Sequence, residues 1–344
     1  MIETTPRMRR LLLGLILLSL LALPASGGTA TSATVSIFYY PWYGTVATDG
    51  SYLHWSQHGH VPPDDIAAAY YPAEGVYSSA DSHVVATQMD EIRSAGVDQI
   101  VVSWWGRGSP EDARLAGVAA AARRDGLSVA VHIEPYTGRT VDSIVTDVAY
   151  LEHLGIATFY VYRPFDFPVA DWAADRTQLH AGGAVLYAET PLVGAAAAAG
   201  FDGVYTYDIV TYGGRMFGRL CTEAHHVHLL CAPSVGPGYD ARRATGDPRV
   251  KPRRDGTTYD AMWRAAIAAH PDGITITSFN EWHEGTQIEP ADSDPRHGAY
   301  RYGTYDGAWG LHGTAAETAY LVRTSYWANV FRSTSPPQLK TRHP

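Results

Sequence analysis

The sequence is poor in charge and especially in basic residues. Only 18% of its 344 residues are charged, and 26 Lys and Arg face 35 Asp and Glu, which gives a formal net charge of −9. Nucleic-acid binding requires a basic patch or stripe that neutralises phosphates, so this balance argues against a nucleic-acid partner. Because 46% of the residues are apolar, the chain can bury a large core, and a disordered protein is excluded.

Long hydrophobic runs are also scarce, and only one stands out. The apolar run from Leu11 to Leu23 follows Arg7, Arg9 and Arg10 and precedes small residues. It is shorter than the roughly 20 residues that cross a bilayer, and the pattern is typical of a secretory signal. We expect residues 1–28 to be a signal peptide, cleaved between about 25 and 33, and the mature protein to be exported without a membrane anchor. An uncleaved anchor is the alternative.

Cysteine is rare, with Cys221 and Cys231 the two in the chain. An oxidising compartment permits a disulfide between them. However, the sequence predicts a helix ending at Ala224 and a strand from His226 to Cys231, which would place the two cysteines at opposite ends of the strand. That separation would exceed the reach of a disulfide, so the predicted geometry argues against pairing and leaves the question open.

Several motifs that define enzyme classes are missing. No Gly-x-Ser-x-Gly elbow or dinucleotide glycine fingerprint follows a predicted strand, so esterase and oxidoreductase functions lack their defining parts. In the stretch from His283 to Gln287, Gln287 stands where a zinc protease needs its second His. None of the 15 His completes a tetrahedral zinc site by its spacing. We therefore expect neither a metal nor a cofactor.

Short β-rich runs alternate along the chain with amphipathic or Ala-rich stretches. This pattern is typical of βα units around a parallel sheet. The predicted strands are Val35–Tyr40, Gln99–Trp104, Ser128–Ile133, Thr158–Tyr162, Ala184–Tyr187, Gly203–Tyr207, His226–Cys231 and Ile274–Ser278. The predicted helices are Ser82–Ala95, Pro110–Arg124, Val141–Leu154, Val169–Leu179, Leu192–Ala199, Ile209–Ala224, Tyr259–Ala269 and Thr314–Phe331. Eight strands, each followed by a helix, indicate a single (β/α)8 TIM barrel.

The barrel is expected to occupy residues 34–332 as one catalytic domain. Residues 333–344, which contain Pro336 and Pro337, are predicted to be a disordered tail. Two long loops, 44–80 and 232–258, follow the first and seventh strands. In a barrel such loops belong to the C-terminal face, where active sites lie.

The carboxyl ends of the predicted strands carry aromatic and acidic side chains. They are Tyr40, Trp42, Tyr43, Trp104, Trp105, Glu134, Tyr136, Arg163, Asp166, Glu189, Tyr205, Tyr207, Asp208, Tyr239 and the run Asn280 to Glu284. Aromatic faces beside carboxylates can stack on sugar rings and bind their hydroxyls. The pattern predicts an aromatic-lined cleft that binds carbohydrate.

The stretch from Ser278 to Pro290 is the most acidic, with Glu281, Glu284 and Glu289. Two carboxylates that share a pocket acquire different pKa values, so one can act as a base while the other stays protonated as an acid. Glu281 and Glu284 fit this division, although an exposed acidic loop is the simpler alternative. His283 is the one histidine we expect to function in the site.

Two further candidates lie elsewhere. Glu134 follows a run of β-forming residues and should point into the cleft, unless it serves a buried ion pair. The basic segment that contains Arg243 is more typical of a solvated face, but one of its arginines could clamp a substrate hydroxyl.

Four segments resemble glycoside hydrolase family 99, which contains endo-α-1,2-mannosidases and endo-α-1,2-mannanases. They are Tyr39-Tyr40-Pro41-Trp42-Tyr43-Gly44, His132-Ile133-Glu134-Pro135-Tyr136, Val161-Tyr162-Arg163 and above all Ser278 to Pro290. The resemblance runs from about Val35 to Phe331. It implies a (β/α)8 barrel that cleaves inside mannan or N-glycan chains with retention of configuration and without a metal.

The resemblance also implies a mechanism and a set of residues. Glu281 matches the base that deprotonates the sugar's own 2-hydroxyl, which then attacks the anomeric carbon to form a 1,2-anhydro sugar. Glu284 matches the acid that protonates the leaving oxygen and later activates water. The other positions match sugar-binding residues: Glu134, Trp104, Tyr40, Tyr43, Tyr205, Tyr207, Arg243, Trp282 and His283.

The sequence is also compatible with a different catalytic mechanism and with a non-catalytic function. An ordinary double displacement would use Glu134 and one of the Glu281/Glu284 pair about 5 Å apart, on mannan or on another α-glycan. A non-catalytic polysaccharide-binding barrel would keep the aromatic cleft. The expected partner is α-mannan or a high-mannose glycan, bound by a monomer, and Trp42 with the 44–80 loop would decide whether a glucosylated glycan or plain mannan fits.

Overall fold

The computed structural model describes residues 1–2 and 33–334. The predicted signal peptide lies outside the described residues apart from Met1 and Ile2. The last helix runs to Thr334 and so includes the first two residues of the predicted tail, the rest of which also lies outside them.

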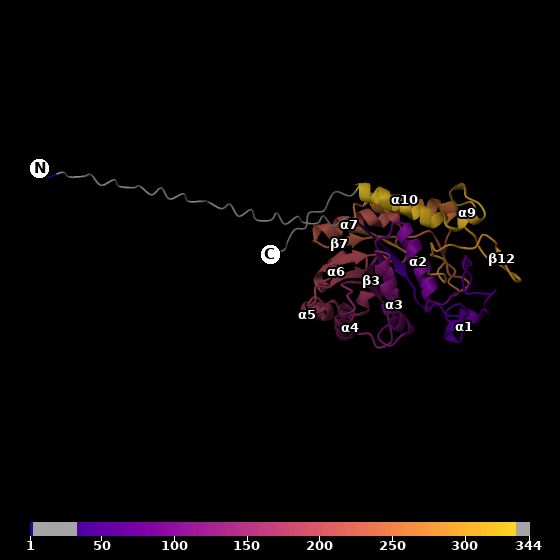
Figure 1. The fold of residues 1–344 in the computed structure, drawn as a ribbon, viewed down its shortest axis with the longest axis horizontal. Coiled ribbons are helices and arrows are strands. Elements are labelled where there is room, and N and C mark those ends of the chain that lie inside the picture. Colours follow the sequence, from indigo (N-terminus) through magenta and orange to yellow (C-terminus); the bar gives the residue numbers. More distant parts are fainter. Residues whose placement is uncertain (3–32, 335–344) are drawn as a thin grey trace.

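Parallel strands close into a barrel inside a ring of helices (Figure 1). The strands are β1 (Thr34–Tyr39), β2 (Gln99–Trp104), β3 (Ser128–Ile133), β4 (Thr158–Val161), β5 (Val185–Glu189), β6 (Gly203–Tyr205), β7 (Leu230–Ala232), β8 (Ser234–Val235) and β11 (Gly273–Ile276). Their order is β7-β6-β5-β4-β3-β2-β1-β11-β8. The two ends of this order, β7 and β8, are separated in the chain by Pro233 alone, so the sheet closes on itself and the predicted barrel is confirmed.

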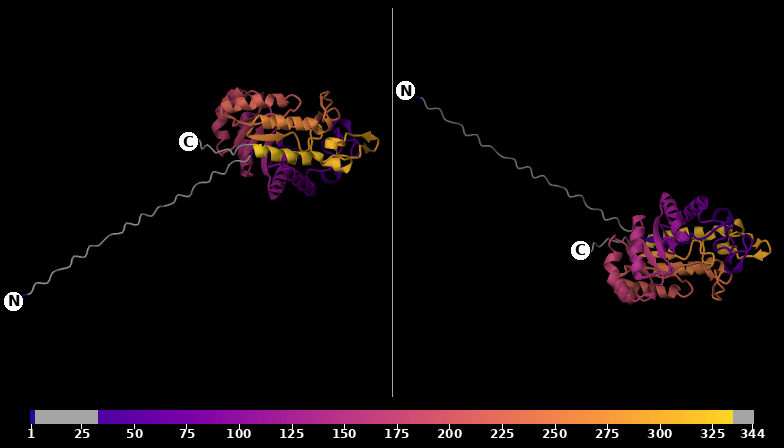
Figure 2. Two further views of the ribbon diagram at one scale, coloured as in Figure 1. Left: turned by 90° about the horizontal axis from the view of Figure 1, so that it is seen from above. Right: turned by 90° about the horizontal axis from the view of Figure 1, so that it is seen from below.

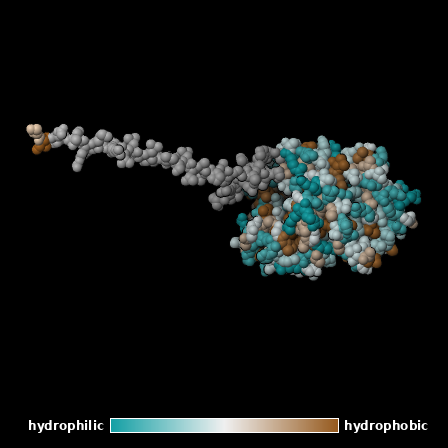
Figure 3. Space-filling view, viewed as in Figure 1, coloured by the Kyte–Doolittle hydropathy of each residue, from teal (hydrophilic) through white to brown (hydrophobic). Residues whose placement is uncertain are grey.

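A helix follows most strands and covers the outside of the barrel. The helices are α2 (Ser82–Ser94), α3 (Pro110–Arg124), α4 (Val141–His153), α5 (Val169–Leu179), α6 (Val193–Ala199), α7 (Phe217–His226), α8 (Thr257–Ala268) and α10 (Ala319–Thr334). Helices α8 and α10 lie side by side (Figure 2). On the face in Figure 3, apolar side chains are scattered among polar ones.

Shorter elements lie in the loops. They are α1 (Val46–Asp49), α9 (Thr314–Glu317), the 3-10 helices η1 (Gln57–Gly59), η2 (Pro164–Asp166), η3 (Gly214–Met216), η4 (Arg254–Gly256) and η5 (Ala308–Gly310), and the pairs β9 (Tyr239–Asp240) with β10 (Val250–Lys251) and β12 (Arg296–His297) with β13 (Tyr300–Arg301). None of the helices in the described part of the chain is long and apolar enough to cross a bilayer.

Local sequence signals explain where the helices begin. Helix α3 starts at Pro110, where the missing N–H needs no partner, and the Ser109 side chain caps it by accepting from the Asp112 N–H. Helix α4 starts with a reciprocal capping box between Thr140 and Ser143. These caps set the lengths of the loops that follow β2 and β3, and so the positions of the residues at the ends of those strands.

The segment that contains helix α7 and the following strand β7 differs from the prediction. Helix α7 extends through His226, and β7 begins only at Leu230. Cys231 is therefore near the start of the strand and close to the end of α7, with a Cα–Cα distance of 5.2 Å to Cys221. The two cysteines form a disulfide, and the expectation that they lie too far apart is wrong because it rested on a strand that starts too early.

Candidate active site

The acidic loop, residues Ser278–Pro290, follows β11 at the C-terminal end of the barrel. Its backbone is held by its own side chains: the Ser278 Oγ accepts from the Glu281 N–H at 2.8 Å and lies 2.9 Å from the Thr286 Oγ1. The Ser278 N–H donates to the Thr286 carbonyl at 2.9 Å. The loop therefore presents Glu281 and Glu284 from a fixed backbone.

The first strand and its extension hold the acidic loop in place. The Asn280 amide accepts from the Tyr40 N–H at 2.7 Å and donates to the Tyr40 carbonyl at 3.0 Å. The Tyr43 hydroxyl donates to the Asn280 carbonyl at 3.0 Å and accepts from the Trp282 N–H at 3.1 Å. These bonds join residues some 240 positions apart, and they fix both glutamates relative to Tyr40.

Glu289 anchors the far side of the same loop. Its carboxylate accepts from the Trp282 indole N–H at 2.6 Å, the Tyr77 hydroxyl at 2.8 Å and the Gln88 amide at 2.6 Å. Burial raises the pKa of Glu289 to about 7. This third glutamate of the loop has a supporting position behind Trp282.

Glu281 is 3% exposed, and its Oε1 accepts from the His283 N–H at 3.1 Å. Burial and the nearby charges of Glu284 and Glu134 raise the pKa of Glu281 well above its usual range. His283 Nε2 lies 2.9 Å from the His54 carbonyl, which can only accept, so this nitrogen carries the proton. Burial lowers the pKa of His283 to about 4, and the ring is neutral at pH 7.

Glu284 is partly buried and faces two tyrosines. The Tyr207 hydroxyl donates to Glu284 Oε2 at 3.3 Å and lies 2.5 Å from the Tyr40 hydroxyl. Burial and the charge of Asp208 raise the pKa of Glu284 to about 7. A carboxyl group with this pKa can donate and accept a proton near neutral pH.

Glu134, which follows β3, completes the acidic cluster. Its Oε1 accepts from the Ser103 hydroxyl at 2.8 Å and from His132 Nδ1 at 2.8 Å, and His132 Nε2 is 2.7 Å from the Tyr205 hydroxyl. These partners come from β2, β3 and β6, so the barrel itself orients the carboxylate. The acidic cluster of Glu134, Glu281 and Glu284 can bind hydroxyl groups and move protons between them.

The predicted sugar-binding residues fall into two groups. Tyr40, Tyr207, Glu134 and His283 contact or neighbour the acidic cluster. Tyr43, Trp104, Tyr205 and Trp282 each have 0% exposure. Their polar atoms are also occupied, so the geometry favours a supporting position behind the acidic cluster.

Arg243 bonds to the loop after β1 and not to the acidic cluster. Its guanidinium donates to Asp65 at 2.6 Å and to the Ile66 carbonyl, and it stacks 5.0 Å from the centre of the Tyr302 ring. It holds the loop after β1 to the loop after β8.

Trp104 and its neighbour show how strand alternation divides the site. Ser103 points into the barrel and reaches Glu134, so Trp104 points outward, where its indole donates to Asp112 at 2.8 Å. Trp105, just past the strand, is partly exposed and donates to the Ser103 Oγ at 3.2 Å. Trp105 is therefore the tryptophan placed to meet a ligand, and the alternation in β2 could have identified it.

Three more residues at strand ends lie near the site: Tyr162 and Glu189 were not selected from the sequence as catalytic or sugar-binding, whereas Trp42 was expected to influence which glycan fits. Trp42 stacks on His54 with ring centres 4.5 Å apart. Tyr162 packs 5.6 Å from the Tyr207 ring, and burial raises the pKa of Glu189 to about 7. All three lie at or near the polar and aromatic strand ends, but sequence alone does not show which of those side chains converge.

Comparison with known proteins gives a consistent result. A model of "Glycosyl hydrolase family 99" matches residues 31–333. The chain is 33% identical over 317 residues to a "Glycoprotein endo-alpha-1,2-mannosidase-like protein" of Danio rerio, covering 75% of this chain and 71% of the relative. It is 34% identical over 313 residues to a "Glycoprotein endo-alpha-1,2-mannosidase" of Xenopus laevis, covering 74% and 69%.

A solved structure agrees with these relatives. The GH99 endo-alpha-mannosidase from Bacteroides thetaiotaomicron, in complex with bis-tris-propane, superposes with a TM-score of 0.79 at 30% identity, covering 88% of this chain and 98% of that one.

Proposed function

Because the chain belongs to glycosyl hydrolase family 99, an endo-α-mannosidase family, we propose that it cleaves α-1,2-linked mannosides within a glycan chain, with Glu281 and Glu284 as its acid–base pair. The observation that carries this proposal is the pair itself: two carboxyl groups on one rigid loop, both with raised pKa values. Burial and repulsion between the two carboxylates keep one proton on the pair near neutral pH, and the reactive form is the one in which Glu284 carries this proton and Glu281 is ionised.

In the first step Glu281 takes the proton of the sugar's 2-hydroxyl. The 2-oxygen attacks the anomeric carbon while the glycosidic bond breaks, and Glu284 gives its proton to the leaving oxygen. A base with a raised pKa suits this step, because it holds the hydroxyl proton more strongly than an ordinary carboxylate does. The nucleophile belongs to the substrate, so its attack has the advantage of a fixed geometry.

In the second step the 1,2-anhydro sugar opens. Glu284, now ionised, takes a proton from water, and the resulting hydroxide forms a bond to the anomeric carbon. The bond from that carbon to the 2-oxygen breaks, and Glu281 returns its proton to the 2-oxygen. Two inversions give net retention of configuration. Tyr207, which donates to Glu284 at 3.3 Å, would stabilise the ionised form between the steps.

Product analysis tests this function. The protein is incubated with α-1,2-branched yeast mannan in the presence of a chelator, beside Glu284→Gln, and the products are followed by mass and NMR. We expect oligosaccharides released as the α-anomer first, at a rate at least about a hundredfold lower for the variant. If neither mannan nor glucosylated high-mannose glycan is cut, the proposed substrate is wrong.

We also propose that the enzyme acts outside the cytoplasm on external mannan. The basic and apolar leader within residues 1–28 supports this, as does the Cys221–Cys231 disulfide, a bond rare in reducing compartments. Protein recovered from the medium of expressing cells should begin between residues 25 and 33 and contain no free thiol. A product that keeps Met1, or that stays with the cells, would contradict export.

A further inference from the structure

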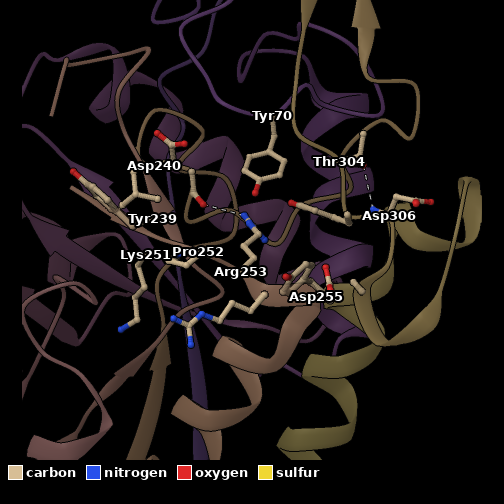
Figure 4. A pocket seen from close by; sticks show the side chains of 15 residues that line it. Tyr70, Tyr239, Asp240, Lys251, Pro252, Arg253, Asp255, Thr304 and Asp306 are labelled. Carbon is tan, nitrogen blue, oxygen red and sulfur yellow. Dashed lines mark hydrogen bonds between the residues drawn. The ribbon is translucent and has the colours of Figure 1, made fainter. Parts of the chain in front are cut away.

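A pocket of about 290 Å³ lies beside the acidic loop (Figure 4). Its walls come from the β9–β10 hairpin, residues 252–255, residues 304–308, Tyr70, Tyr320 and Gly285. None of Glu134, Glu281 and Glu284 is among its lining residues. It is therefore a separate hollow, joined to the acidic loop through the backbone of Gly285.

Arg253 is the central side chain of this pocket and is 8% exposed. Its Nη2 donates to the carbonyls of Gly285 at 3.0 Å and Gln287 at 2.6 Å. Its guanidinium lies 4.6 Å from the centre of the Tyr70 ring and 4.7 Å from those of Tyr305 and Tyr320. Nε and Nη1 are buried without a hydrogen-bond partner in the described part of the chain, and a donor left so is unfavourable.

The charges of the lining identify the class of ligand. Six charged residues contribute to the lining, three cationic and three acidic: Lys251, Arg253 and Arg254, and Asp240, Asp255 and Asp306. A balanced lining favours neither an anion nor a cation. Tyrosine side chains, cationic N–H donors and carboxylate acceptors together suit a neutral ring with apolar C–H faces and several hydroxyl groups.

We propose that this pocket is a second carbohydrate site, which binds a mannosyl residue of the substrate chain outside the catalytic cleft. The choice of mannose rests on the proposed function. A polymer held at Arg253 stays close to the acidic loop, because the same guanidinium binds the Gly285 carbonyl next to Glu284. The second site then raises the effective concentration of polymer at the cleft, and short oligosaccharides that cannot reach both sites gain nothing.

Thr304→Trp tests the proposal by filling the pocket. Thr304 is partly exposed and lines the pocket. Thr314→Trp, at the exposed start of α9, is the matched control. Each variant is combined with Glu281→Gln so that the mannan is not consumed. Its retardation in native gels that contain yeast mannan then gives the affinity for the polymer. Hydrolysis of a short manno-oligosaccharide is measured in the background with Glu281 intact.

We expect Thr304→Trp to weaken mannan binding by about fivefold or more, with hydrolysis of the short substrate changed less than about twofold and Thr314→Trp silent in both assays. Asp255→Asn should also weaken mannan binding, and asparagine tolerates the positive φ of 51° at this position.

Unchanged retardation of Thr304→Trp would overturn the proposal. An equal loss on the short substrate would also overturn it, because the pocket would then belong to the cleft. Absence of hydrolysis by the unmodified protein would instead contradict the proposed function and leave the binding result intact.

Discussion

Replacing Glu281 by Gln should lower kcat on α-1,2-mannan by about 10³–10⁴-fold, near the upper range for loss of a general base. The amide has the shape of the carboxylate, and its oxygen can still accept from the His283 N–H, but it cannot take the proton of the 2-hydroxyl. KM should change little, because the hydroxyl-binding groups of Tyr40 and Glu134 stay in place. Initial rates of reducing-end release over a range of mannan concentrations give both constants.

Glu223→Gln is the matched control for this variant. Glu223 lies on α7, is exposed, and makes an ion pair with Arg219 at 3.8 Å. Its substitution should leave both constants unchanged. A Glu281→Gln enzyme that keeps more than about a tenth of the rate, with an unchanged melting temperature, would show that Glu281 is not the base.

Replacing Glu284 by Gln should have an effect of about 10²–10⁴-fold and should also change the dependence on pH. The pKa of Glu284 is about 7, and the first step needs its protonated form. In the unmodified enzyme kcat/KM should therefore fall about tenfold per pH unit as the pH rises above 7. On the acid side activity should fall as the pair takes up a second proton and Glu281 no longer acts as a base.

The Glu284→Gln enzyme should lose the alkaline limb, because an amide side chain has no proton to lose in this pH range. Rates from pH 4 to 9 in buffers of constant ionic strength test this, with Glu223→Gln again as the control. An alkaline limb that persists at the same position in the Glu284→Gln enzyme would assign the titration to another group and contradict the proposed acid.

The fold and the centre of the site could be predicted from the sequence because both depend on local signals. β-rich runs alternate with helices, and parallel strands bring their carboxyl ends to one face of the barrel. Glu134, Glu281 and Glu284 each follow such a strand, and they do come together. Carboxylates placed at strand ends are conspicuous in a sequence with only 18% charged residues.

The orientation of the aromatic residues was harder to predict, because it depends on contacts between distant segments. Tyr43 and Trp282 are joined by a hydrogen bond across 239 positions, and the Trp282 indole is held by Glu289. The sequence around Tyr43 or Trp282 does not show that its polar atom is already engaged in a hydrogen bond within the protein. Trp104 is different, because the inward position of Ser103 already implies that its neighbour in the strand points outward.

The disulfide shows the sensitivity of such predictions to a strand boundary. Starting the strand at His226 places Cys231 at the far end, whereas β7 begins at Leu230 and ends before Pro233. A shift of four residues changes the distance between the cysteines from prohibitive to 5.2 Å between their Cα atoms. No local sequence signal marks the end of helix α7 at His226 or the start of β7 at Leu230.

In the proposed mechanism the substrate's own 2-hydroxyl, and not an enzyme carboxylate, attacks the anomeric carbon. The most direct test is a mannobiosyl fluoride whose reacting sugar carries fluorine in place of the 2-hydroxyl, compared with its 2-hydroxyl parent, with fluoride release and the intact mass of the protein recorded together. We expect the parent to release fluoride and the 2-fluoro compound to give neither fluoride nor a gain in protein mass. A burst of fluoride from the 2-fluoro compound, with one glycosyl unit attached to a glutamate, would contradict this mechanism and establish an ordinary double displacement.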